Sequence, residues 1–173
     1  MTAQPEHTES QEEERVANAY DRILENVRNI LSTTSDITKK EFDRALNQAG
    51  TSLEGASQYT KDEVEKARKA VRKDWQNFVK VAGKQKEDFL ESEQFQRISD
   101  TGLGMLAKMT KAVKNWATFL DEKIDEQITY HTGEIAGAGT FECVECEKTM
   151  TFKKSGRIPP CSSCKSTTFR RVL

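Results

Sequence analysis

The 173-residue sequence has little of what turns and deep cores require: three Pro, nine Gly and 35% hydrophobic residues. The scarcity of Pro and Gly excludes a loop-rich all-β domain, because turns consume these residues. The low apolar content, beside 32% charged residues, argues against a large core with a deep catalytic cleft. No stretch approaches the roughly 18 consecutive apolar residues of a membrane-spanning helix, so we expect no membrane association.

The beginning of the chain also lacks a targeting signal. Residues 1–14 contain five Glu and no apolar run, which is unlike a secretory signal peptide. We therefore expect a cytoplasmic protein, in a reducing compartment where disulfides are disfavoured. There are only four Cys, all after residue 140. This placement favours metal binding over cross-linking.

Amphipathic helical patterning is what the sequence has in abundance, and it covers residues 10–131. Three capping-box patterns mark predicted helix starts: Ser10 with Glu13, Thr38 with Glu41, and Thr60 with Glu63. Apolar residues then recur with a period near 3.5 from Val64 to Phe89, and a further stripe runs from Leu106 to Ile128. We predict four helices in an elongated antiparallel bundle or coiled coil, with breaks near residues 50–55 and 99–104. The polar residues 1–9 are predicted to be disordered.

The C-terminal part differs in composition. Residues 1–140 hold 20 Lys and Arg against 25 Asp and Glu, whereas residues 141–173 hold seven against three. The Gly-containing residues 132–140 are predicted to be a linker between the two parts. Residues 141–173 contain β-prone stretches and the helix-excluding pair Pro159 and Pro160. The predicted fold is therefore mainly α, followed by a small module of three β-strands.

The four cysteines carry the clearest chemical signal in the sequence. Cys143 and Cys146 form one Cys-x-x-Cys unit, Cys161 and Cys164 form another, and 14 residues separate the units. Each unit can turn two thiolates toward one ion, at about 2.3 Å, so that two units supply a tetrahedral set. We predict one structural Zn²⁺ ion, with no open position for catalysis. Iron with four thiolates remains the alternative, and oxidation that expels the metal is chemically feasible.

The Cys pattern, flanked by Phe141, Phe152, Pro160 and Phe169, resembles a zinc ribbon. The whole layout resembles an uncharacterised bacterial zinc-ribbon-containing family, the YbeL-like proteins. This resemblance implies a cytoplasmic bacterial protein with a four-Cys zinc site and no established activity. One feature departs from many zinc ribbons, which have Gly after the second Cys of each unit. Here Glu147 and Lys165 occupy those positions.

We expect the protein to act as a binding or adaptor module, with a protein partner or self-association through the helices. Nucleic acid is the alternative partner, through cations and aromatic side chains that could contact phosphates and bases. These are Lys153, Lys154, Arg157, Arg170 and Arg171, with Phe152 and Phe169. The two Phe can equally fill the small β core.

The helix predicted over residues 61–86 adds nine basic side chains against four acidic ones. We interpret this run as a solvated face, in which acids such as Asp74 dilute any phosphate-binding stripe. Arg68, on the apolar seam, is expected to place its guanidinium in water. In architecture only, a helical hairpin with a four-Cys module also resembles secondary-channel regulators of RNA polymerase. Those proteins present acidic residues at the hairpin tip, where this sequence offers Asp100 alone.

An enzyme is the least supported interpretation. His7 lies in the predicted disordered start, and His131 stands alone at the end of the helical region. The glycines around residues 133–139 lack the strand, helix and Lys of a phosphate-binding loop. Ser162 and Ser163 have no evident general base. We therefore predict no catalytic residues.

Overall fold

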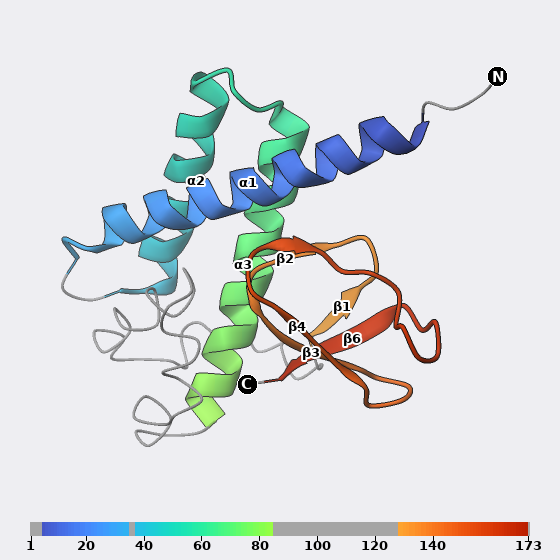
Figure 1. Ribbon diagram of the computed structural model, residues 1–173. Helices are drawn as coiled ribbons and strands as arrows, with labels where there is room; N and C mark the ends of the chain where they lie inside the picture. Colours follow the sequence, from blue (N-terminus) through green and yellow to red (C-terminus); the bar gives the residue numbers. More distant parts are fainter. Residues whose placement is uncertain (1–4, 35–36, 85–127, 173) are drawn as a thin grey trace.

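The computed structural model describes residues 5–34, 37–84 and 128–172 and combines three helices with six short strands (Figure 1). The helices are α1 (Pro5–Leu31), α2 (Lys39–Gly55) and α3 (Lys61–Lys84). The strands are β1 (Thr129–His131), β2 (Ile135–Ala136), β3 (Gly139–Cys143), β4 (Thr149–Phe152), β5 (Gly156–Arg157) and β6 (Thr168–Val172). A helical part followed by a C-terminal antiparallel sheet is thus confirmed. In the part described, no helix is both long and apolar enough to cross a membrane.

Two of the predicted capping boxes set the starts of α2 and α3. Thr38 accepts a hydrogen bond from the N–H of Glu41, and the Glu41 side chain accepts one from the N–H of Thr38. Thr60 and Glu63 make the same reciprocal pair, at 3.2 and 2.7 Å. These bonds satisfy N–H groups that have no partner within the helix. The local sequence therefore determines where both helices begin.

The N-terminal helix starts earlier than predicted. Its first residue is Pro5 rather than a residue after Ser10, so residues 5–9 are helical and the prediction of disorder over residues 1–9 is wrong for them. Proline is favoured at the first helical position, because an N–H there has no intrahelical acceptor. Two of these five residues are Glu, and negative charge near the start of a helix is stabilised by the positive end of the helix dipole.

The three helices share one apolar core. Tyr20 and Ile23 of α1, Leu46 of α2 and Val71 of α3 are almost fully buried. Trp75 stacks on Phe42 of α2, with ring centroids 4.8 Å apart. Figure 1 shows α1 lying across the hairpin formed by α2 and α3 rather than along it. The structure therefore does not confirm an elongated coiled coil, although the predicted apolar seam of α3 does form the core.

One residue of that seam behaves differently from expectation. The Arg68 side chain is 18% exposed, and its guanidinium pairs with Glu54 at 3.0 Å instead of extending into water. It packs directly on Gly50, where a Cβ atom would lie 2.8 Å from the guanidinium. Gly50 therefore permits Arg68 to cross α2. The predicted break near residues 50–55 falls at the end of α2, where Ser57 has a φ of 56°.

The β part begins earlier and contains more strands than predicted. Residues 129–131 form β1 instead of helix, and the predicted linker contributes β2 and the start of β3. One sheet has four antiparallel strands in the order β1-β6-β3-β4, and β2 pairs with β5 in a second. The structure therefore does not confirm a module of three strands. All six strands are two to five residues long, and most of their pairings join strands distant in the sequence, so local patterning did not reveal all of them.

The turn predicted at residues 99–104, and the fourth predicted helix as far as residue 127, lie outside the described residues. Ile128, at the end of that stripe, packs against the β core.

Glu63 links the start of α3 to α1 and gives a testable pH dependence. Its side chain, 6% exposed, pairs with Arg15 at 2.6 Å, and the hydrogen bond from Arg15 lowers the pKa of Glu63. The stabilisation is complete above the unfolded pKa of about 4.3 and is lost as the pH falls through the lower folded value. We expect Glu63→Gln to reduce the free energy of unfolding at pH 7 and to flatten its decline between about pH 5 and 3.

Urea unfolding at several pH values measures this effect. The exposed Glu25→Gln serves as the control and should follow the wild type. Parallel pH curves for wild type and Glu63→Gln would contradict the assignment.

Candidate metal centre

The four predicted ligands lie together at one end of the β part. The sulfurs of Cys143, Cys146, Cys161 and Cys164 are all within 4.8 Å of one another, and all four cysteines are free. Cys143 and Cys164 have sulfurs 3.5 Å apart, and Cys146 and Cys161 have sulfurs 3.6 Å apart. Four thiolates about 2.3 Å from one zinc ion would be about 3.8 Å apart. The donor set and its spacing therefore fit one tetrahedral metal ion.

Two matching turns, hereafter the knuckles, present these sulfurs. In the first, the N–H of Cys143 bonds to the carbonyl of Lys148 and the N–H of Glu147 bonds to the carbonyl of Cys143. In the second, the N–H of Cys161 bonds to Ser166 and that of Lys165 bonds to Cys161. All four distances are 2.9 or 3.0 Å. The sequence repeat of Cys-x-x-Cys is thus a repeat of backbone structure.

The backbone of the knuckles shows the effect of having Glu147 and Lys165 where many zinc ribbons have Gly. Glu147 and Lys165, which follow the second Cys of each knuckle, have φ angles of 58° and 62°. This left-handed conformation favours Gly, because a Cβ atom crowds the backbone there. The chain therefore keeps the turn while tolerating some strain at two non-Gly residues.

Backbone amides point at the buried sulfur of each knuckle. N–H groups of Cys164 and Ser163 lower the pKa of Cys161 to about 6. Burial opposes the thiolate of Cys143, but N–H groups of Cys146 and Glu145 outweigh it and lower the pKa of Cys143. Such bonds favour the thiolate, which is the metal-binding form.

The raised pKa of Cys164 shows that the four sulfurs lack a compensating positive charge. The N–H of Ser166 favours the Cys164 thiolate, yet burial and the three neighbouring sulfurs raise the pKa of Cys164 to about 12. Four negative charges this close repel one another strongly. A divalent cation among the sulfurs removes that repulsion. Both the electrostatics and the geometry of the cluster therefore fit a bound metal ion.

A small core supports the knuckles. Phe141 and Phe169, together with the two inner cysteines Cys143 and Cys161, are essentially fully buried, and Phe152 packs against them. Phe141 lies edge-on to Tyr130, with ring centroids 5.1 Å apart. The flanking aromatic residues thus form the core of the β part, as one of the two sequence interpretations proposed.

These features define a class of protein: a four-Cys zinc ribbon joined to a helical part. The chain belongs to the family described as a zinc-ribbon containing domain, DUF1451, whose family model matches residues 29–173. This match confirms the predicted membership of a zinc-ribbon-containing family, whereas the YbeL-like name remains a prediction. No curated protein and no solved structure matches the chain.

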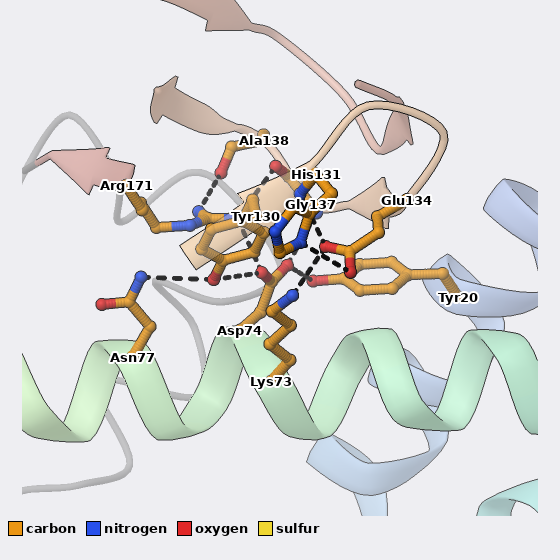
Figure 2. A network of polar contacts seen from close by, with 10 residues as sticks. All are labelled: Tyr20, Lys73, Asp74, Asn77, Tyr130, His131, Glu134, Gly137, Ala138 and Arg171. Atoms are coloured by element: carbon orange, nitrogen blue, oxygen red, sulfur yellow. Dashed lines mark hydrogen bonds and ion pairs between the residues drawn. The ribbon is translucent and has the colours of Figure 1, made fainter. Parts of the chain in front are cut away.

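A second polar cluster joins this ribbon to the helices (Figure 2). At its centre is Asp74 of α3, whose side chain is fully buried. One carboxylate oxygen accepts hydrogen bonds from the hydroxyl of Tyr20 and the N–H of Gly137, both at 2.7 Å. The other accepts one from the hydroxyl of Tyr130 at 2.8 Å and lies 3.0 Å from Arg171. The interpretation of Asp74 as a solvated acid is therefore wrong.

Arg171 is equally well enclosed. Its side chain is 5% exposed, donates to the carbonyls of Ala138 and Gly137, and lies over the Phe141 ring at 4.6 Å. Burial alone lowers the pKa of an arginine, but the charge of Asp74 outweighs this and raises the pKa of Arg171. Burial, and then the charge of Asp74, raise the pKa of the Tyr20 and Tyr130 hydroxyls. Both phenols therefore stay protonated as donors.

The sequence offered one signal for this cluster. Asp74 follows Val71 by three residues and precedes Phe78 by four, which places a carboxylate on the apolar face of α3. Its partners are 54 to 97 residues away in the chain, so no local pattern could identify them.

The two positive-φ residues of the knuckles provide a test of the site geometry. Glu147→Gly or Lys165→Gly should each stabilise the metal-bound protein by about 1 kcal/mol, because Gly relieves the left-handed strain. Thermal unfolding of the zinc-loaded chain measures the gain. Lys148→Gly, at a neighbouring position without positive φ, is the matched control and should not stabilise. Destabilisation by both test variants would contradict the observed turns.

Proposed function

We propose that the protein binds one structural zinc ion through Cys143, Cys146, Cys161 and Cys164 and acts as a non-catalytic binding module. The observation that carries this proposal is the closed set of four sulfurs within 4.8 Å of one another. Four protein ligands leave no position for a substrate or an activated water. Zinc is preferred over iron because the family is that of a zinc-ribbon containing domain.

The zinc ion has a folding role in this proposal. The ribbon core consists of few buried residues, and two of them are the ligands Cys143 and Cys161. Without metal, only weak hydrogen bonds between sulfurs join the thiols of the two knuckles. Metal binding, at roughly 10–16 kcal/mol apparent, would supply the folding free energy that this core cannot.

The position of the knuckles supports a contact with another molecule. Figure 1 shows both knuckle loops on the side of the sheet that faces away from α1 and α3. Val144, at 42% exposure, is the one large hydrophobic side chain that is exposed in the described part of the chain. It lies between the two cysteines of the first knuckle. We assign the knuckle end of the ribbon as the partner-binding surface.

The described residues favour a protein partner over nucleic acid. Three arginines of the ribbon are already paired with carboxylates: Arg157 with Glu13, Arg170 with Glu142, and Arg171 with Asp74. Phe169 is fully buried and cannot stack on a base. These pairings leave fewer of the predicted cations for phosphate binding, which depends on free Lys and Arg.

Metal analysis tests the zinc assignment directly. The purified full chain should contain one zinc ion per molecule by plasma mass spectrometry, and Cys143→Ser or Cys161→Ser should reduce this content at least about tenfold. Ser162→Ala, between the cysteines of the second knuckle, should leave it unchanged. Iron in place of zinc, or equal zinc content in both Cys variants and wild type, would refute the assignment.

Affinity capture tests the binding role. A tagged full chain, incubated with lysate, should retain a defined protein band after nuclease treatment. Val144→Asp should weaken this capture without loss of zinc, because it places a charge on the proposed contact. The exposed Thr149→Asp, at the start of β4, is the control outside the knuckle. Material that disappears with nuclease would instead indicate nucleic acid as the partner.

A further inference from the structure

The buried carboxylate of Asp74 depends mainly on the ribbon for its partners. Of the four groups that contact it within the described residues, only the Tyr20 hydroxyl comes from the helices. The N–H of Gly137, the hydroxyl of Tyr130 and the guanidinium of Arg171 all come from the C-terminal part. If the ribbon leaves, Asp74 becomes exposed to water and loses three of these four partners. The ribbon also contacts both helices, through Arg157 to Glu13 of α1 and through Arg171 to Asp74 of α3, so α1 and α3 lose the partner that they share.

The same two strands connect this cluster to the metal centre. Strand β3 runs from Gly139, next to the Arg171-bound carbonyls, to the ligand Cys143. Strand β6 begins four residues after the ligand Cys164 and contains Arg171. The two strands pair so that Phe141 faces Arg171 and Cys143 faces Phe169. Metal binding at one end of this pair therefore holds Arg171 in place at the other.

Other contacts between the ribbon and the helices also require a folded ribbon. Lys73 of α3 pairs with Glu134 at 2.6 Å, and Ser155 donates a hydrogen bond to Asp21 of α1 at 2.8 Å. Asn77 donates to the Tyr130 hydroxyl at 3.2 Å. Each of these pairs joins the ribbon to α1 or α3, and none involves α2. Among the described residues, this boundary therefore consists mainly of polar contacts, although Ile135 also packs against the helical core.

We propose that the metal ion controls the packing of α1 against α3: with metal the ribbon completes the site around Asp74, and without metal the two helices separate locally. The fold then contains a metal-dependent conformational switch, and the helices respond to an ion that they do not touch. This inference rests on the proposed zinc binding at the four cysteines.

Hydrogen exchange followed by mass spectrometry on the full chain tests the switch. The zinc-loaded protein is compared with the same protein after chelation in the presence of a thiol reductant, and metal content is measured in both samples. Amides of the ribbon should lose protection on chelation. Amides of residues 16–31 in α1 and 64–79 in α3 should also exchange at least about tenfold faster, because their interface opens.

Gly137→Ala separates docking from metal binding. A Cβ atom at this position would lie 2.3 Å from the Tyr20 hydroxyl and 3.1 Å from Asp74, while the four sulfurs are untouched. We expect this variant to retain zinc but to show the fast helical exchange of the chelated wild type. Gly156→Ala, where a Cβ atom meets no neighbour within 4 Å, is the matched control and should behave as wild type.

Asp74→Asn provides an independent readout if Gly137→Ala fails to fold. This variant removes the ion pair with Arg171 that ties α3 to the ribbon, so its zinc-loaded helices are already less protected and the acceleration of helical exchange on chelation should shrink several-fold. Asp43→Asn, whose half-exposed carboxylate pairs with Arg72, should retain the full response.

The outcomes separate this inference from the zinc assignment. Helices that stay equally protected after confirmed metal loss would overturn the switch and leave zinc binding intact. So would a chelation response in Asp74→Asn that equals that of Asp43→Asn. A purified protein without bound metal would overturn both.

Discussion

The fold depends on one buried charge, the carboxylate of Asp74, which lies between the helices and the sheet. A carboxylate removed from water is tolerated only when hydrogen bonds and an opposite charge replace its hydration. Here two phenols, a backbone amide and an arginine do so, and they come from segments on both sides of α3 in the sequence. This requirement fixes how α1, α3 and the ribbon lie relative to one another. An apolar boundary would allow sliding, whereas four directed contacts specify one arrangement.

The metal centre shows a comparable arrangement on a smaller scale. Each knuckle uses backbone amides to favour the thiolate of its inner cysteine, and the pKa of Cys161 falls to about 6 as a result. The neighbouring sulfurs raise the pKa of Cys164 to about 12, and a cation among the four sulfurs would offset the repulsion between their thiolates. Metal binding by the four thiolates and folding of the ribbon are therefore coupled. Through β3 and β6 that coupling reaches Asp74, which gives a structural role to the short strands between the two sites.

The structure assigns the basic side chains of the C-terminal part a different role from the one that the sequence suggests. As a list of residues, the basic excess after residue 140 suggested a phosphate-binding surface. In the fold, Arg157 and Arg171 neutralise acids of α1 and α3, and Arg170 neutralises an acid of the neighbouring strand. Ion pairs between the basic ribbon and the acidic helices thus help to join these two parts of the chain. This pairing is the reason for favouring an adaptor over a nucleic-acid-binding protein.

The sequence by itself determined the features that rest on short-range rules. The capping boxes at Thr38 and Thr60 determined two helix starts, periodicity determined the buried face of α3, and Cys-x-x-Cys spacing determined the four sulfurs that meet. Each rule involves residues a few positions apart, or a ligand set whose geometry the metal imposes. Only the tertiary structure decided that α1 crosses the other helices, that the predicted linker forms strands, and that Asp74 and Arg171 meet across 97 residues of chain. These depend on pairing between distant segments, for which no single segment carries a signal, because the stabilisation exists only once both are in place.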